Sequence, residues 1–155
     1  MLNPGGYMDI ASTGIDAKGA ILPEYTADGK NINPPVTFSQ IPEGTESLVF
    51  TITDPDAPGG TFYHWVVYNM PPSTLQIIEG SAPAGSQVGV NDFGVAGYGG
   101  PKPPSGTHHY RFTLFALDTT LNLPDGADHA QLEAVMDGHV IDQHEIVGTY
   151  SAKNN

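Results

Sequence analysis

The sequence predicts a mostly β fold, and three observations support this expectation. The 155 residues include 19 glycines and 14 prolines, which is typical of short strands joined by tight turns. Several runs rich in β-branched and aromatic residues are separated by such turns. The length fits a single domain over residues 1–155, which buries about 68–70% of its unfolded surface. The chain can therefore fold without disulfides, and it has no cysteine.

Five segments are the expected strands. In the last of them, Phe112 and Leu114 fall on one face while Phe115 and Leu117 fall on the other, so both faces are apolar and we expect an internal strand. In chain order the expected strands are Val36 to Ser39, Ser47 to Thr53, Phe62 to Asn69, Val88 to Val90 and Tyr110 to Leu117.

The C-terminal part of the chain changes character. Asp128 to Asp137 is expected to be a helix, with an N-cap at Asp128 and a stop at Gly138. His139 to Glu145 is expected to form a second short helix or a turn, and Ile146-Val147 could then rejoin a sheet. His129, His139 and His144 are interpreted as surface or helix-end residues of this tail.

Charge and composition exclude several classes of partner. Seventeen acidic residues against five basic ones give a formal net charge of -12, so we expect no binding to nucleic acid or to anionic membrane surfaces. No stretch approaches the roughly 20 apolar residues that span a bilayer. No signal peptide is visible at the start of this sequence, so a cytoplasmic location is the default expectation. We expect no cofactor and no bound metal.

The loop that follows the second expected strand carries two carboxylates. Pro55 and Pro58 fix the backbone around Asp54 and Asp56, and the glycines after them permit a tight turn. Asp54 directly ends the strand, and we expect it to point into a pocket. Asp56 is interpreted as an ordinary turn residue whose side chain caps nearby amides.

A second group of polar residues lies further along the chain. His64 is a polar ring inside an apolar strand, and a constrained loop with Gly106 leads into His108 and Tyr110. If the chain is extended from His108 onward, His108 and Tyr110 share one face while the following residues, His109 and Arg111, share the other. Positive charge in the pocket would then come from His64 and His108, whose ordinary pKa near ~6.5 allows a neighbouring carboxylate to favour the imidazolium.

Several separated motifs, in order along the chain, resemble the phosphatidylethanolamine-binding protein family, and most closely its bacterial and archaeal branch, which is often described as Raf-kinase-inhibitor-like. The resemblance covers nearly the whole chain. The motifs are Asp54-Pro-Asp-Ala-Pro58, His64 followed by Trp-Val-Val-Tyr-Asn-Met70, Tyr98-Gly-Gly-Pro101, Gly106-Thr-His108-His-Tyr110 and Val147-Gly-Thr-Tyr150.

The resemblance implies a fold and a ligand pocket. The implied fold has a large central antiparallel sheet with Greek-key features, a smaller second sheet and a C-terminal helical segment. The implied pocket binds phosphate-type or other small anions. In the family pattern an arginine commonly follows the second histidine, whereas this chain has His109 there. The pocket residues carried over are Asp54, His64, Gly100, Pro101, His108 and Tyr110.

Three functions from different classes compete at this point. The leading expectation is a binding module, not an enzyme, that holds phosphate or a phosphoethanolamine-like headgroup, with a regulatory or inhibitory role toward a kinase or protease implied by the resemblance. The alternative is a hydrolase, in which Asp54, His64 and His108 act as a metal site or as acid and base. A third option is a structural role in which a homodimer surface matters more than the pocket.

Overall fold

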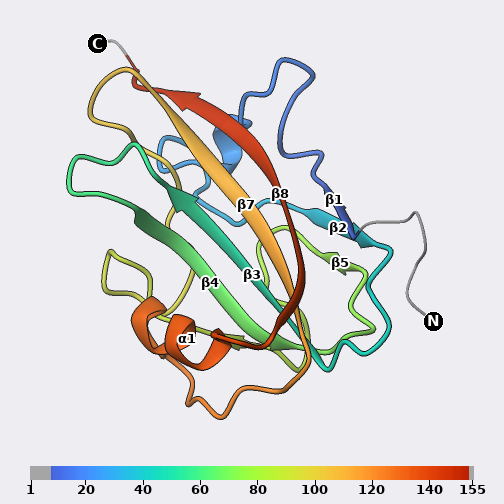
Figure 1. The fold of residues 1–155 in the computed structure, drawn as a ribbon. Helices are drawn as coiled ribbons and strands as arrows, with labels where there is room; N and C mark the ends of the chain where they lie inside the picture. Colours follow the sequence, from blue (N-terminus) through green and yellow to red (C-terminus); the bar gives the residue numbers. More distant parts are fainter. Residues whose placement is uncertain (1–7, 154–155) are drawn as a thin grey trace.

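The computed structural model describes residues 8–153 and has two antiparallel sheets (Figure 1). The larger sheet has five strands in the order β6-β4-β3-β7-β8, and the smaller one has three in the order β1-β2-β5. The elements are β1 (Asp9–Ala11), the 3₁₀ turn η1 (Pro23–Tyr25), β2 (Val36–Ser39), β3 (Ser47–Asp54), β4 (Phe62–Met70), β5 (Gln76–Ile77), β6 (Gln87–Val88), β7 (Thr107–Leu117), α1 (His129–Met136) and β8 (Val140–Ser151).

The larger sheet contains a Greek key. Strands β3, β4 and β6 follow one another in this sheet, and the chain then returns so that β7 lies antiparallel to β3 on its other side. The connection brings residues 47–54 beside residues 107–117. The mostly β class, the Greek-key sheet, the smaller second sheet and the C-terminal helix expected from the sequence are therefore confirmed.

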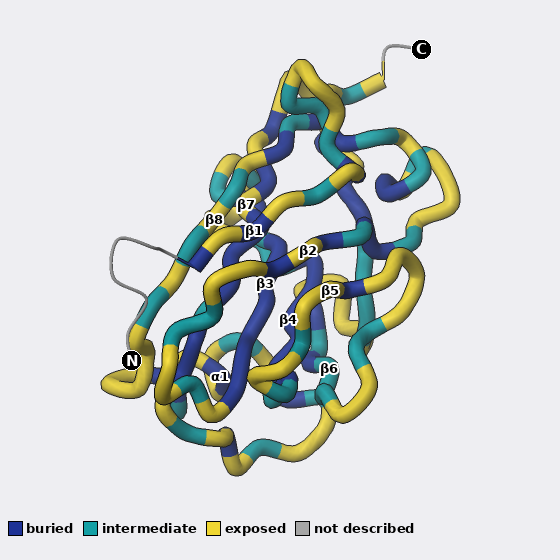
Figure 2. Tube along the Cα trace, turned by 90° about the vertical axis from the view of Figure 1, so that its right-hand side faces the viewer, coloured by how far each residue is buried: buried dark blue, intermediate teal, exposed yellow. Residues whose placement is uncertain are grey.

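The main core lies between the two sheets. Its aromatic centre is Phe50 of β3, whose ring lies 6.0 Å from Trp65 and 6.1 Å from Phe112 in edge-on arrangements. Such pairs contribute about 0.5–1.5 kcal/mol beyond the burial of their surface. Figure 2 shows β3 and β4 as largely buried along their length, as expected for strands that are covered on both faces.

Helix α1 covers part of the opposite face of the larger sheet. Its buried residues Leu132 and Met136 pack on Val49, Val66 and neighbouring side chains in a second, smaller cluster. Within residues 8–153 no helix is long and apolar enough to cross a membrane.

The expected strand positions agree closely with the structure. Val36–Ser39 is β2 as predicted, β3 and β4 each extend one residue further, and β7 begins three residues earlier, at Thr107. Strand β6 ends at Val88, while Val90 forms only an isolated bridge to Ala96. The internal position of β7, between β3 and β8, is confirmed.

The expected second helix or turn at His139 to Glu145 is wrong. Residues from Val140 onward belong to β8, which pairs with β7 over almost its whole length. Partial burial alternates along this strand, with Asp142 and His144 more covered than Gln143 and Glu145. Pairing with β7 gives these residues regular backbone hydrogen bonds. This stabilisation outweighs the weak strand propensity of their polar side chains.

Helix α1 begins with a complete capping box. The Asp128 carboxylate accepts from the Gln131 amide at 2.8 Å, and the Gln131 side chain accepts from the Asp128 amide at 3.0 Å. The predicted N-cap at Asp128 is confirmed.

We expect Asp128→Ala to lower the free energy of unfolding by about 1 kcal/mol, because the Gln131 amide loses its acceptor. Urea unfolding followed by circular dichroism measures this loss. Asp137→Ala, at the other end of the same helix, is the control and should be neutral or slightly stabilising, since an acidic residue there opposes the helix dipole. Equal losses for the two variants would contradict the assigned role of the cap.

Candidate functional site

A cavity of about 300 Å³ opens at the end of the larger sheet where β3 ends and β4 and β7 begin. We call it the β3–β7 cavity. Four of the side chains predicted from the sequence line it together: Asp54, His64, His108 and Tyr110. They come from three strands that are distant in sequence, so the fold brings together the carboxylate, the two imidazoles and the phenol.

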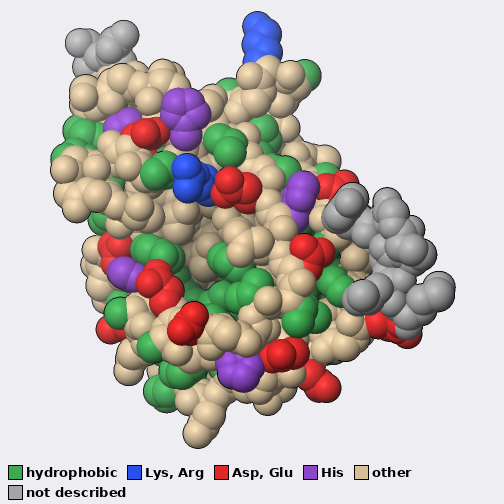
Figure 3. All heavy atoms as spheres, viewed as in Figure 1, with side chains coloured by type: hydrophobic (Ala, Val, Ile, Leu, Met, Phe, Trp, Pro, Cys, Tyr) green, Lys and Arg blue, Asp and Glu red, His purple; other side chains and the backbone are tan. Residues whose placement is uncertain are grey.

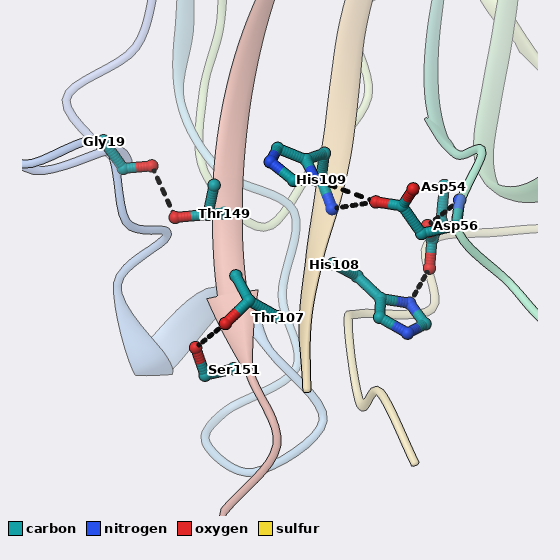
Figure 4. Close-up of polar contacts among 8 residues, drawn as sticks. All are labelled: Gly19, Asp54, Asp56, Thr107, His108, His109, Thr149 and Ser151. Carbon is teal, nitrogen blue, oxygen red and sulfur yellow. Dashed lines mark hydrogen bonds and ion pairs between the residues drawn. The ribbon is translucent and has the colours of Figure 1, made fainter. Parts of the chain in front are cut away.

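The Asp54 carboxylate and the His108 ring form the buried centre of this cavity. His108 Nδ1 lies 2.6 Å from Asp54 Oδ2, and both side chains are at most 10% exposed (Figure 4). Since an ionised carboxylate only accepts, Nδ1 carries the proton and donates it to Asp54. Asp54 Oδ1 accepts from the Asp56 amide at 2.8 Å. Both carboxylate oxygens are therefore engaged by the protein, and His108 Nε2 is the nitrogen left for a ligand.

His64 reaches the cavity because of an irregularity in β4. In the pairing of β3 with β4, Ile52 lies opposite Trp65 and Thr53 lies opposite Tyr63, so His64 is an extra residue between two regular pairs. Such a β-bulge can redirect a side chain to the other face of the sheet. His64 Nδ1 lies 2.6 Å from the Gly99 carbonyl, to which it donates, and Gly99 N donates back to the His64 carbonyl at 3.0 Å.

Burial changes the acid–base properties of two of these groups. Desolvation lowers the pKa of His64 below its ordinary value, although the Gly99 carbonyl and the Asp54 carboxylate act in the opposite direction. The His64 ring is therefore neutral near pH 7. Desolvation, followed by the nearby Asp54 and Asp56 carboxylates, raises the pKa of Tyr110, so its phenol keeps its proton and can donate.

Alternation along β7 places the neighbouring residues as predicted. His108 and Tyr110 are buried, while His109 and Arg111 are exposed. Arg111 points away from the cavity, with its Nε 4.0 Å from the Glu145 carboxylate.

The interpretation of Asp56 as a cap within its own turn is wrong. Its carboxylate accepts from the His109 amide at 2.8 Å and lies 2.9 Å from His109 Nδ1, across 53 residues of sequence (Figure 4). The contact with the His109 side chain makes the largest contribution to lowering the pKa of Asp56 below its ordinary value. The turn is instead capped by Asp54. His109, at the position where the family commonly has arginine, thus fastens the β3–β4 loop to the outer side of β7.

Gly100 and Pro101 are not part of the cavity lining. Gly100 N donates to the Asn31 side chain at 2.7 Å, and the Pro101 carbonyl accepts from Ala27 at 3.0 Å. Both residues join the loop behind the cavity to the segment after η1. Pro58 lines the cavity, Pro55 precedes Asp56 in the same turn, and Gly106 has a φ of 66°, a left-handed conformation suited to glycine.

Two of the further lining residues that the sequence analysis did not single out are Lys102 and Phe93. Lys102 brings a basic side chain to the wall of the cavity. Phe93 also lines it and lies edge-on to Phe62 and His64, with ring centroids 4.8 Å and 5.6 Å away. Lys102 directly follows the Gly100-Pro101 motif, so its place in the sequence could have identified it as a cavity residue. Phe93 lies in a loop without such a motif, so nothing in the sequence indicated that it lines the cavity.

Comparison with known proteins agrees with this geometry. The family model described as phosphatidylethanolamine-binding protein matches residues 12–151. The chain belongs to the phosphatidylethanolamine-binding protein family. This result agrees with the resemblance seen in the Asp54, His64 and His108 motifs.

Relatives of the family occur in archaea and bacteria. A UPF0098 protein of Pyrococcus horikoshii is 48% identical over 139 residues, which is 84% of this chain and 70% of that protein. A UPF0098 protein of Methanothermobacter thermautotrophicus is 40% identical over 148 residues, 92% of this chain and 98% of that one. A Mycobacterium tuberculosis relative, 40% identical over 137 residues (86% of this chain and 68% of that protein), carries the name lipoprotein LppC.

Solved structures of the family show the same fold. The crystal structure of a phosphatidylethanolamine-binding protein homologue from Chlamydia trachomatis matches with a TM-score of 0.89 and 36% identity, covering 95% of this chain and 99% of that one. Escherichia coli YbcL matches with a TM-score of 0.87 and 32% identity, covering 96% of this chain and all of that one.

Close packing behind the cavity can be tested at Gly100. A Cβ there would lie 2.6 Å from Asn31 Oδ1 and 2.8 Å from the Tyr25 carbonyl, so we expect Gly100→Ala to cost about 1–3 kcal/mol of unfolding free energy. Gly97→Ala is the matched control, because a Cβ there meets nothing within 4 Å. Urea unfolding of both variants measures the difference. A Gly100→Ala protein as stable as Gly97→Ala would contradict the packing described here.

Proposed function

We propose that this chain binds a small anion, phosphate or a phosphorylated headgroup, in the β3–β7 cavity and acts by occupancy and not by turnover. The observation that carries the proposal is the convergence of His64, His108 and Tyr110 with Lys102 on one cavity whose carboxylate is already engaged by the protein.

The hydrogen-bonding capacity of the cavity supports an anionic ligand. Asp54 uses its two oxygens on the Asp56 amide and on His108 Nδ1. The groups left for a ligand are the Tyr110 hydroxyl, the Lys102 ammonium and one nitrogen on each imidazole. The first two are donors that suit phosphate oxygens.

The imidazoles add a link to pH. His64 uses Nδ1–H on the Gly99 carbonyl, so its neutral ring offers only an acceptor at Nε2. A phosphate therefore either brings a proton with it or induces His64 to take one up, since a bound negative charge raises the pKa of a nearby imidazole. Both routes make binding stronger when protons are available.

Size and wall chemistry limit the ligand. A volume of about 300 Å³ is at the lower end of the range for small-molecule sites. Apolar residues such as Pro58, Phe62 and Phe93 form the walls. The cavity suits a phosphate with a small substituent, and it is too small for the acyl chains of a lipid.

The finer roles stay predictions. Inhibition of a kinase or protease rests on the family resemblance alone, and a homodimer as the acting species is the separate structural option named from the sequence. A cytoplasmic location is the expectation from the sequence, and the relative named as a lipoprotein offers the other possibility. A ligand test comes first, because an inhibitory role would act through occupancy of the cavity.

We expect the imidazole NMR signals of His64 and His108 to shift on titration with inorganic phosphate and with phosphoethanolamine. Affinity should fall as pH rises from below the ordinary histidine pKa, because burial lowers the pKa of the free His64 ring and the protonated state binds better. Calorimetry in buffers of different ionisation enthalpy should show net proton uptake on binding.

Variants separate the cavity from the rest of the surface. Tyr110→Phe removes only a hydroxyl and should weaken phosphate binding about tenfold, whereas His139→Ala, whose ring pairs with Asp118 beyond the other end of β7, should leave it close to wild type. His108→Ala should abolish binding. Unchanged imidazole signals at saturating phosphate would overturn the proposal.

The Asp54–His108 pair also favours a second candidate, a metal-free hydrolase. A buried carboxylate bonded to Nδ1 orients an imidazole so that Nε2 can act as a general base. Among residues 8–153 no set of three His, Asp or Glu side chains is arranged to hold a metal, so the metal-dependent form of this alternative has less support. Release of phosphate from p-nitrophenyl phosphate, lost in His108→Ala and kept in His139→Ala, would favour the hydrolase.

A further inference from the structure

A second concavity lies on the opposite face of the larger sheet, between α1 and the strands. We call it the α1 groove. It has a volume of about 880 Å³, and its sheet side includes Thr51, Phe115 and Val140. Figure 3 views this face, and hydrophobic side chains are visible within the hollow.

The groove exists because α1 is too short to cover the face. Eight residues make a helix about 12 Å long. Strands β7 and β8 have 11 and 12 residues, and because a strand rises about 3.3 Å per residue, each is roughly three times as long as the helix. Leu132 and Met136 anchor the helix, while the side chains that it turns toward the opening include the small Ala130 and Ala134. Phe115 is left only partly buried.

The charges lining the groove all have one sign. Glu133 and Asp137 line it from α1, and its lining contains no lysine or arginine. The Tyr63 hydroxyl donates to Glu133 and fixes its position, and His129 Nδ1 lies 3.6 Å from the same carboxylate.

The placement of Asp137 is unfavourable for the helix itself. It is the C-cap residue, next to the carbonyl end of α1, and the last turn has no basic residue. Cations, not carboxylates, stabilise that end of a helix. A positively charged group bound beside Asp137 would relieve this repulsion.

We propose that the α1 groove binds a basic amphipathic segment of a partner protein, with apolar side chains on Phe115 and Val140 and with lysine or arginine beside Glu133 and Asp137. Ile141, the neighbour of Val140 on β8, is also exposed, so apolar surface extends beyond the groove lining and suits an occupant longer than a small molecule. A second copy of this chain fits poorly, because each copy carries a net charge of -12.

This surface is separate from the β3–β7 cavity. Tyr63 contacts the groove, whereas Phe62 and His64 on either side of it in sequence line the cavity. Failure of phosphate to bind would therefore leave this proposal standing, and the reverse also holds.

The test uses a fluorescein-labelled peptide of leucine and lysine, patterned as an amphipathic helix, and measures its fluorescence anisotropy with the full chain at low salt. Binding is expected, and it should weaken as salt is added. Neither the same peptide with glutamate in place of lysine nor the one with serine in place of leucine should bind.

Two variants test the groove residues. Glu133→Gln with Asp137→Asn should weaken binding of the lysine peptide about fivefold. Glu24→Gln with Glu46→Gln makes the same change in net charge outside the groove and should have a smaller effect. Ala134→Trp should fill the groove and abolish binding, while Ala134→Ser should not. Circular dichroism and urea unfolding check that each variant is folded.

Three results would overturn the proposal. The first is no binding of the lysine peptide to the wild-type chain. The second is an equal loss of affinity in the two charge variants, since general electrostatic attraction would then explain the binding. The third is full affinity in a folded Ala134→Trp protein.

Discussion

The hydrogen bond between Asp54 and His108 is the contact on which the site depends. It joins the last residue of β3 to the second residue of β7, two strands that are neighbours only because of the Greek-key return of the chain. The bond orients the His108 ring, and together with the Asp56 amide it engages both oxygens of the Asp54 carboxylate. Without it, a buried charge would be left without a partner at the centre of the cavity, at a considerable energetic cost.

Much of the fold and site could be predicted from sequence because the relevant patterns are local. Alternation along residues 107–117 was enough to place His108 and Tyr110 together and to turn Arg111 outward. The polar alternation in residues 140–145 was too weak to indicate a strand, since its partner β7 supplies the stabilisation. The contact of Asp56 with His109 could not be predicted either, because it spans 53 residues and depends on the sheet register.

His64 illustrates a different limit. Regular alternation along β4 would not place it on the same face as Trp65, and only the bulge between Tyr63 and Trp65 does so. No residue type in β4 predicts a bulge at this position. The family resemblance identified His64 as a cavity residue, whereas the physical means of placing it there became visible only in the pairing of the strands.

The long return of the chain from β4 to β7 also has a consequence for how the protein reaches its native state. Asp54 and His108 are 54 residues apart, and closing a loop of that length costs entropy before any contact made at its ends can compensate for it. Sheets dominated by such non-local pairing fold slowly. The cavity exists only where β7 is docked on β3, so a chain in which these two strands have not paired lacks the ligand site.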